Sequence, residues 1–519
     1  MKNHLKILSF IFVFGSFYNW SQQNLIPISS YYKDKLFSPF KSTSFSNGSF
    51  LPVTESEINL IKNIADSSKQ YYEISAFLMK KHLIEIKEKD YYLTISPTFD
   101  ISRGRDENDS LAPILFQNTR GFFIEGDFLK NFSFSTSFYE NQARFTKYET
   151  AYYQSVGELY PNGASYVTQN AVIPGGARTK PFKIGGFDYA YAIGNFVYAP
   201  TKKIQISAGN NAHFIGAGYR SLLLSDNSIN SPYLQTNLKL TPKLSFIYMR
   251  SKLTNLLRRS IKTTDEAYYE SKGLSVNYLT YKASEKLNIS LFEGIIWSKG
   301  DSISSKYVNP LFYNPIPIIS TPLLTNKKDE FNSLLGLNTE YLINYKHRIY
   351  NQIAMSNFDF KNIGFQIGYR GYNFEYLKNF LFQFEYNYVS KLLYSATNRR
   401  LNYSQYNLPL AIARGSGFQE FVIRSNYEYN YFYIDVKVNL YQLEGFQKNS
   451  LLAVNKNYPP QHGTIQQEQI EIGFRLNRKM NITVFGTYIY RQESAKESFT
   501  TKFFNVGIRT GLINHYNDF

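Results

Sequence analysis

From Tyr91 onward, apolar and polar side chains alternate with a period of two along much of the chain. In residues 432–440, for example, Phe432, Ile434 and Val436 share one face, and the positions between them carry Tyr, Asp and Lys. The same pattern recurs in residues 382–388, 470–476 and 504–512. A soluble strand with one wet face also alternates in this way, but the many repeats favour a barrel that is apolar outside and polar inside.

The alternating segments number about eighteen, and the joins between them alternate in length. The segments begin near residues 91, 119, 131, 186, 203, 232, 243, 271, 286, 332, 347, 363, 380, 419, 431, 466, 479 and 502. Tight joins lie near residues 130, 201, 241, 284, 378, 430 and 478. Longer joins span roughly 103–118, 141–184, 213–231, 254–270, 297–331, 391–418, 443–465 and 491–501. The join at residues 360–362 is short, although its position belongs to the long set.

Bacterial outer-membrane barrels have an even number of strands, short periplasmic turns and long outer loops. The alternation therefore predicts an all-β fold, a transmembrane antiparallel up-and-down outer-membrane β-barrel of about 18 strands, over residues 90–519. Tyrosine pairs at strand ends, such as Tyr427 and Tyr429, are typical of an aromatic girdle at the lipid head groups. A soluble all-β protein is the alternative.

The first 21 residues have the form of a secretory signal peptide. Lys2 and Lys6 precede or flank the start of an apolar stretch at residues 7–17, and Ser21 is a small residue at which cleavage can occur. The apolar stretch is too short to cross a membrane as a helix. We expect residues 1–21 to be a signal peptide, and the alternative is a buried N-terminal helix in a chain that is not exported.

Residues 22–89 have a different pattern. Thr54 and Glu57 have the spacing of a capping box, and Ile58, Ile61 and Ile64 follow at helical spacing. A second helical pattern runs from about residue 69 to residue 87. We expect a small periplasmic segment with two short helices, which lies beside the barrel or plugs its mouth.

The composition narrows the choice of partners. The chain has no cysteine, and its six histidines have no metal-ligand spacing, so we expect neither a metal site nor a cofactor. The net charge of +17 comes from basic residues that are scattered along the chain. This favours an anionic surface or a polysaccharide as the partner, and not nucleic acid. In an outer membrane the barrel also contacts lipid and lipopolysaccharide.

The glycine-rich segment 209–226 has the most local character of any stretch, and it leads from one strand to the next. His213, Ser221 and Asp226 lie within it, but a Ser-His-Asp triad needs a geometry that spacing cannot supply. No Gly-x-Ser-x-Gly elbow surrounds Ser221. We therefore expect no enzyme activity and no catalytic residue, and instead a folded-in loop in which Arg220 and Asp226 pair near the lumen.

Residues 171–181 lie late in the longest predicted loop and combine glycines with Arg178 and Lys180. Such a stretch can contact a sugar or a phosphate, although turn formation explains the glycines equally well. The candidate ligand-binding residues are His213, Tyr219, Arg220, Asp226, Arg178 and Lys180.

Residues 214–226 (FIGAGYRSLLLSD), with Pro232 and Tyr233, resemble the signature loop of the gliding-motility protein RemB family of Bacteroidota, which is similar to the Wzi capsule-assembly barrels. Further matches to this family are FLPVTESE at 50–57, SPTFD at 96–100, YENQ at 139–142, IPG at 173–175 and GFDY at 186–189. The chain departs from the pattern at residues 210–213, where NNAH replaces the expected Gly-His-Gly-Lys-Asn.

The resemblance implies a non-enzymatic outer-membrane barrel linked to gliding motility, surface adhesion or capsular polysaccharide. It also implies sugar recognition by outer loops and other cell-surface motility proteins as partners. One alternative is a channel for anionic or sugar solutes, because eighteen strands can enclose a pore and Arg424, Arg475 and Arg509 are predicted to face the lumen. The other is an outer-membrane hydrolase that uses Ser221.

Overall fold

The computed structural model describes residues 24–37, 48–54, 82–109, 114–129, 131–162, 165–176, 178–258, 269–298, 308–324, 329–445, 462–478, 480–494 and 498–519. Residues 1–21, the expected signal peptide, lie outside these ranges, as do residues 55–81, which contain most of the two predicted helices. Within the described ranges, no helix combines the length and the apolar character needed to cross a membrane.

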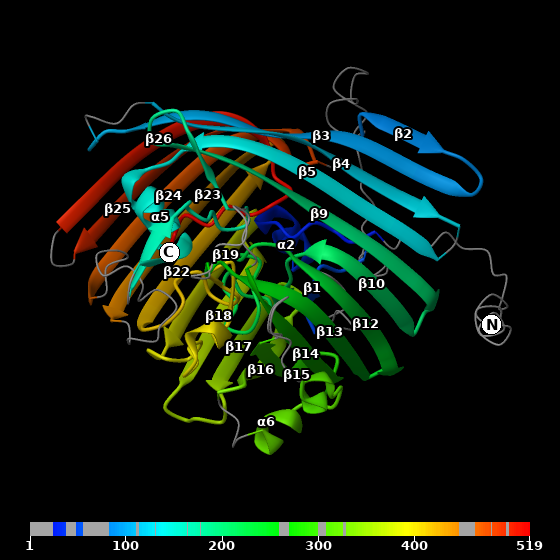
Figure 1. Ribbon diagram of the computed structural model, residues 1–519. Helices are drawn as coiled ribbons and strands as arrows, with labels where there is room; N and C mark the ends of the chain where they lie inside the picture. Colours follow the sequence, from blue (N-terminus) through cyan, green and yellow to red (C-terminus); the bar gives the residue numbers. More distant parts are fainter. Residues whose placement is uncertain are drawn as a thin grey trace, which may run out of the picture.

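In the described part of the chain, eighteen antiparallel strands close into one barrel (Figure 1). They are β3 (Tyr91–Asp106), β4 (Leu115–Phe128), β5 (Phe132–Arg144), β9 (Gly186–Thr201), β10 (Ile204–Asn211), β12 (Ser231–Thr241), β13 (Leu244–Asn255), β14 (Glu270–Lys282), β15 (Leu287–Ser298), β16 (Phe331–Asn344), β17 (His347–Ser356), β18 (Ile363–Phe374), β19 (Leu377–Val389), β22 (Phe418–Tyr429), β23 (Phe432–Glu444), β24 (His462–Asn477), β25 (Ile482–Ser494) and β26 (Ser498–Thr510). The barrel closes because β26 pairs with β3, with Val506 opposite Arg103. The predicted fold is confirmed.

Shorter elements decorate the barrel. Three small two-stranded sheets pair β1 (Phe50–Leu51) with β11 (Phe214–Ile215), β6 (Glu158–Asn162) with β7 (Ser165–Gln169), and β20 (Ser404–Gln405) with β21 (Leu408–Pro409). Strands β2 (Ile84–Lys87) and β8 (Lys180–Phe182) pair with β3 and β9. The helices are α2 (Ser30–Leu36), α5 (Lys147–Ser155), α6 (Ser320–Leu323) and the 3₁₀ helices η2 (Pro310–Tyr313) and η4 (Arg399–Leu401).

The barrel wall is apolar outside and polar inside. On β23, Ile434 is 41% exposed, whereas the alternate residues Tyr433 and Lys437 are only 4% and 6% exposed. On β24, Ile472 is 55% exposed and its neighbour Glu471 is 6% exposed. An apolar outer band with a polar interior is the arrangement of barrels that face lipid, so the predicted direction of the alternating faces is confirmed.

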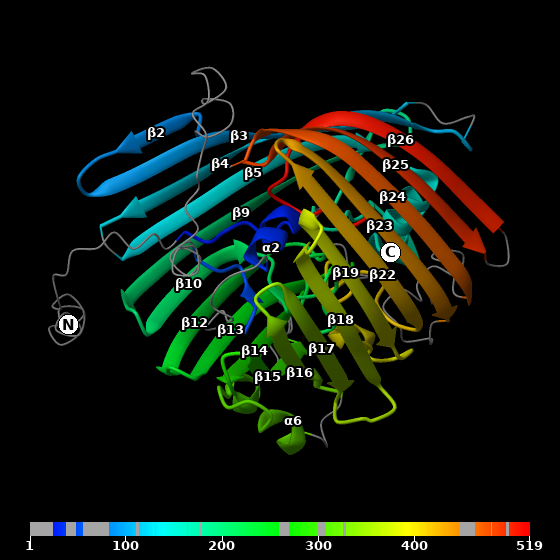
Figure 2. The ribbon, with the colours of Figure 1, turned by 180° about the vertical axis from the view of Figure 1, so that it is seen from behind.

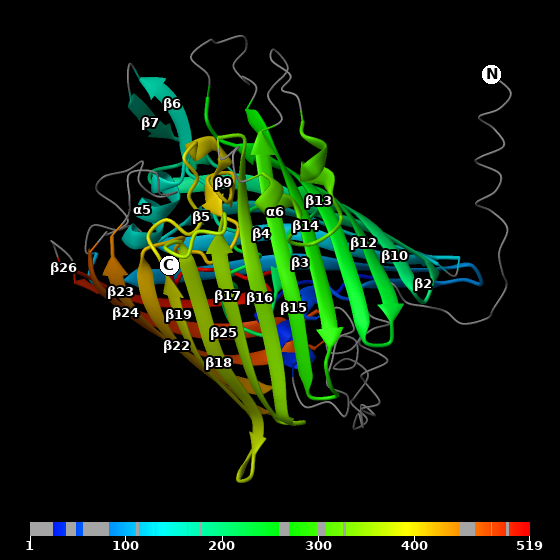
Figure 3. The ribbon, with the colours of Figure 1, turned by 90° about the horizontal axis from the view of Figure 1, so that it is seen from below.

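The two ends of the barrel differ in the length of their connections (Figure 3). At one end, tight turns such as residues 202–203 and 345–346 join neighbouring strands. At the other end the connections are mostly longer, and residues 145–185 carry α5, β6, β7 and β8. By analogy with outer-membrane barrels, we call the end with the long connections the outer end.

Two local predictions were wrong. A long join was expected at residues 491–501, but the connection is only residues 495–497, because the ladder between β25 and β26 continues until Ser494 lies opposite Ser498. The second N-terminal helix was expected to reach residue 87, but Ile84–Lys87 forms strand β2. This strand pairs with the part of β3 that β26 leaves unpaired.

Residues 24–37 lie inside the barrel, where Figure 2 shows α2 in the lumen. The helix begins after Ser29, whose hydroxyl accepts a hydrogen bond from the Tyr32 N–H at 3.4 Å. Asp34 of α2 forms ion pairs with Arg370 and Arg424 of the wall. This segment therefore occupies the lumen, although its helix was not predicted.

Four further described segments fold into the lumen: residues 212–230, 390–417, 511–519 and 48–54. Leu222 and Leu223 of the first are fully buried, and their carbonyl groups accept hydrogen bonds from Tyr394 and Tyr403 of the second, each at 2.9 Å. Together with residues 24–37, these segments form a plug.

Candidate functional site

The glycine-rich loop 212–230 packs directly against the inner wall. Gly216 has a φ of +108°, and a Cβ atom there would lie 2.4 Å from Nε2 of Gln352. A Cβ atom on Gly218 would lie 2.7 Å from a carboxylate oxygen of Glu385. The glycines therefore allow the loop backbone to approach β17 and β19 closely.

Arg220 lies at the centre of a buried charge network. Its guanidinium donates to the Glu420 carboxylate at 2.8 Å and to the Asp518 carboxylate at 3.1 Å. It also donates to the carbonyl oxygen of Asp518 at 2.6 Å. The Arg220 side chain is 2% exposed, so the network joins the loop, strand β22 and residues 511–519 in the interior. Arg220 thus has a structural role, because it holds these three parts of the chain together.

The expected pairing of Arg220 with Asp226 was wrong. Asp226 instead accepts hydrogen bonds from Asn514 at 2.8 Å and from the Tyr516 hydroxyl at 2.7 Å. Tyr219 donates to the Asp518 carboxylate at 2.7 Å, on the same side as Arg220. The sequence could not show that Arg220 pairs with Asp518 and not with Asp226, because Asp518 is almost 300 residues away from Arg220.

The residues of the hydrolase hypothesis have separate surroundings. Ser221 is fully buried, and its hydroxyl lies 3.4 Å from the Gln352 side-chain oxygen and accepts from the N–H groups of Leu223 and Leu224. The His213 ring packs 4.6 Å from the Tyr233 ring and 5.6 Å from the Phe50 ring. Since Asp226 binds the C-terminal segment, these three residues do not form a triad in this arrangement.

Arg178 and Lys180 lie in the outer connection 145–185, away from the lumen residues. Arg178 donates to Glu158 at 3.0 Å and to the Tyr269 hydroxyl at 3.2 Å, whereas Lys180 is exposed on β8. The six predicted ligand residues thus fall into a lumen group of four, of which Asp226 is half-buried and the others are buried, and an outer group of two. The structure does not bring the two groups together.

Glu158 is the centre of the outer group, and the sequence analysis missed it. Its buried carboxylate accepts hydrogen bonds from Arg178, Arg258, Tyr269 and Asn170. Burial alone would raise the pKa of Glu158, but these hydrogen bonds outweigh it and hold the pKa below its usual value. The cluster joins residues 145–185 to Arg258 and Tyr269, and no local spacing signals a contact across 100 residues.

A pocket of about 190 Å³ lies at the outer end, between three connections. It is lined by Ser155, Val156, Gly157, Leu159, Asn255, Leu257, Asn398, Arg399, Arg400, Asn402, Ser404 and Asn407. Asn407 donates to the Gly157 carbonyl at 2.9 Å, and Asn255 donates to the Arg400 carbonyl at 2.8 Å. The pocket therefore combines side-chain amides, two guanidinium groups and a small apolar patch, and hydrogen bonds hold the three connections together. The sequence analysis did not identify these residues.

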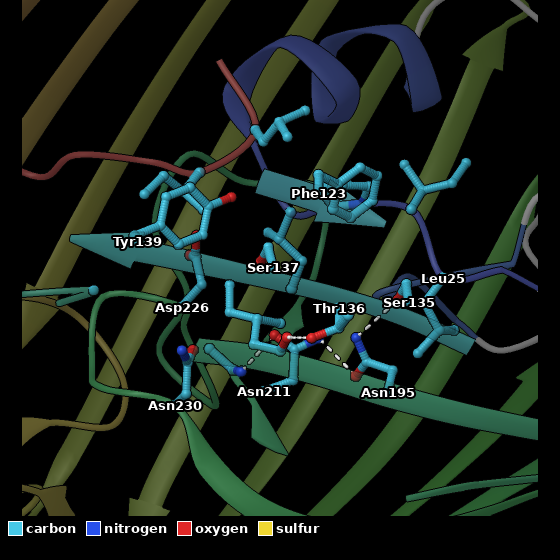
Figure 4. A pocket seen from close by; sticks show the side chains of 18 of the residues that line it. Leu25, Phe123, Ser135, Thr136, Ser137, Tyr139, Asn195, Asn211, Asp226 and Asn230 are labelled. Carbon is cyan, nitrogen blue, oxygen red and sulfur yellow. Dashed lines mark hydrogen bonds between the residues drawn. The ribbon is translucent and has the colours of Figure 1, made fainter. Parts of the chain in front are cut away.

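The lumen holds smaller polar spaces. One cavity, of about 60 Å³, lies between residues 25–28 and the wall of β5 and β9 (Figure 4). There Asn195 donates to the Ser135 hydroxyl at 3.3 Å, and Asn211 donates to the Asn195 side-chain oxygen at 3.1 Å. A cavity of this size holds a few water molecules.

A second lumen cavity, of about 180 Å³, lies between α2, residues 511–515 and the wall of β22–β26. The three arginines predicted to face the lumen line it, as expected. Each is paired with a carboxylate: Arg424 with Asp34 and Asp435, Arg475 with Glu428, and Arg509 with Glu471. Because of these pairs, the cavity lacks the excess positive charge that an anion channel would need. Among the described residues, no cluster of His, Asp and Glu side chains is arranged to hold a metal ion.

No protein-family model matches the sequence, and no curated protein matches it either. The RemB resemblance therefore stays a prediction.

The fold is similar to solved outer-membrane barrels. One is Wzi, an outer-membrane protein involved in group 1 capsule assembly in Escherichia coli, described as a carbohydrate-binding β-barrel; the TM-score is 0.56 at 13% identity over 95% of this chain and 100% of that chain. OprD of Pseudomonas aeruginosa has a TM-score of 0.44 at 11% identity over 83% of this chain and 96% of that one. OccAB2 of Acinetobacter baumannii has a TM-score of 0.42 at 10% identity over 81% and 97%. At such identities the likeness concerns the fold alone, and the likeness to Wzi extends over almost the whole chain.

Proposed function

We propose that this protein is a non-enzymatic outer-membrane surface protein that retains polysaccharide at its outer loops. The observation that carries the proposal is the contrast between the two compartments of the barrel. The lumen is occupied by described segments of the chain itself, whereas the outer end presents a pocket lined by amides and guanidinium groups. A long polymer can reach the pocket at the outer end without entering the lumen.

The chemistry of the pocket suits a sugar chain. Asparagine amides both donate and accept hydrogen bonds, as sugar hydroxyls do. The Nε of Arg400 lies 3.4 Å from the Glu270 carboxylate, and guanidinium groups such as those of Arg399 and Arg400 can also donate hydrogen bonds to a carboxylate or a sulfate on an acidic sugar. The net charge of +17 favours an anionic polymer. The likeness of the fold to Wzi, whose description names carbohydrate binding, supports the same reading. Both gliding motility and capsule attachment would use such a protein.

Binding of the organism's own extracellular polysaccharide to the full chain in nanodiscs tests the proposal. The double variant Arg399→Gln/Arg400→Gln should weaken binding by about tenfold or more, because hydrogen bonds to charged groups contribute about 1.5–3 kcal/mol each. The matched control is Lys202→Gln/Lys203→Gln, which makes the same charge change in an exposed turn at the opposite end. If the unaltered protein does not bind the polysaccharide, the proposal fails.

A further inference from the structure

The outer wall of β13–β15 carries a polar patch. On β15, Phe292 packs in the lumen core, so the next residue, Glu293, points to the outside of the barrel. It lies near the middle of the strand, yet its side chain is fully buried. Arg250, Ser275 and Asn277 of the neighbouring strands also point outward and extend this patch.

Residues 308–324, which we call the strap, fold back over this patch from the long connection between β15 and β16. The Glu293 carboxylate accepts hydrogen bonds from the Ile318 N–H at 3.0 Å and from the Thr321 hydroxyl at 2.7 Å. Asn277 donates to the Asn314 carbonyl at 3.0 Å. The strap therefore satisfies polar groups of the wall that would otherwise face lipid.

Further contacts fix the strap in place. Ser275 donates to the Phe312 carbonyl at 2.7 Å, and the Arg250 guanidinium lies 3.7 Å from the centre of the Tyr313 ring. The outward-facing Trp297 stacks on Phe312 with ring centres 5.4 Å apart and an angle of 17°. Trp297 and Phe312 belong to an apolar cluster that is separate from the lumen core. The strap is thus a second layer on the outside of the barrel.

The free surface of the strap is apolar. Its sequence, VNPLFYNPIPIISTPLL, contains no charged residue. The exposed members are Pro310, Pro315, Ile316, Ile319, Pro322 and Leu323, of which Ile316 is 53% and Leu323 is 64% exposed. Exposure of such an apolar face to water at the cell surface would be unfavourable, whereas a segment that lies against acyl chains requires an apolar face.

We propose that the strap lies within the hydrocarbon layer of the membrane and restores the apolar belt of the barrel over the polar patch of β13–β15. The partner of the strap is the acyl-chain region of the lipid, and Glu293 is the wall residue that anchors the strap. In Figure 1, α6 of the strap lies outside the ring of wall strands, beyond β15 and β16. The inference depends on the proposed membrane location of the barrel, but not on polysaccharide binding.

Because the chain has no cysteine, one probe can be placed at a time. Leu323→Cys carries a fluorophore on the strap, Ile472→Cys carries it on the exposed wall, and Ile184→Cys carries it in an outer connection where the native side chain is 85% exposed. The full-length variants are reconstituted into vesicles of lipids with brominated acyl chains, which quench a fluorophore at close range. The probe at residue 323 should be quenched as strongly as the probe at residue 472, and at least about threefold more than the probe at residue 184.

Quenching at residue 323 no stronger than at residue 184, with strong quenching at residue 472, overturns the inference alone. Weak quenching at residue 472 overturns the membrane location and, with it, the inference. The folded state of each variant is checked by its heat-dependent migration on gels. If Leu323→Cys does not fold, Ile316→Cys takes its place with the same expected result and the same contradiction.

Discussion

Replacement of Arg220 by methionine should greatly destabilise the plug. The side chain is 2% exposed and contacts two carboxylates, those of Glu420 and Asp518, both of which are fully buried. Removal of one partner of a buried ion pair typically costs about 3–5 kcal/mol, because the other partner stays buried and uncompensated. Asp518 keeps Lys437 at 3.0 Å, so Glu420 is the carboxylate that loses most.

Unfolding in urea, with the protein in lipid vesicles and followed by tryptophan fluorescence and by proteolysis of the plug, measures this cost. Arg478→Met is the matched control, because Arg478 lies in an exposed tight turn, where we expect a change below about 1 kcal/mol. Arg220→Met combined with Glu420→Gln should recover part of the loss, since the uncompensated charge is removed. A change below about 1 kcal/mol for Arg220→Met, with the plug still resistant to protease, would refute the argument that this arginine ties the loop to the wall.

Three further predictions address the plug, the outer loops and the strap. Deletion of residues 24–37 removes Asp34 from Arg370 and Arg424, so protease should cleave the rest of the plug faster than it does in the unaltered protein. Hydrogen bonds lower the pKa of Glu158, so the stabilisation by its ionised carboxylate is fully present above about pH 4.5 and is lost as the pH falls through this lowered pKa. The protease sensitivity of the outer loops should therefore rise in acid. The Glu158→Gln variant should not show this pH dependence. Glu293→Ala should loosen the strap and shift Trp297 emission, whereas Ile434→Val on the open wall should leave the emission unchanged.

The sequence predicted the barrel because the signals that define it are local. Alternation on β23 and β24 requires only neighbouring residues, and a tight turn such as 202–203 limits the distance between two strands. The strand starts expected near residues 91, 186, 347 and 363 agree with those of the structure. The glycine-rich loop was correctly expected to fold inward, and its glycines permit the close backbone approach to the wall that the structure shows.

The contacts of the plug and of the strap could not be predicted, because they join residues that are distant in sequence. Arg220 was assigned to Asp226, the nearest acid in the same loop, and nothing local indicates that Asp518 lies beside it. Glu158 meets Arg258 across 100 residues. For the strap a signal did exist: Glu293 interrupts the outward apolar face of β15, and residues 308–324 carry no charge. Only the geometry shows that the second feature covers the first.

Single-molecule conductance of the full chain in planar lipid bilayers tests the central claim, a membrane barrel with an occupied lumen, most directly. An open barrel of eighteen strands encloses an aqueous channel, whereas a lumen filled by residues 24–37, 212–230, 390–417 and 511–519 should show no large ohmic steps. Insertion without such steps is the predicted result. Large steady steps from the unaltered protein would contradict the plug and favour a solute channel.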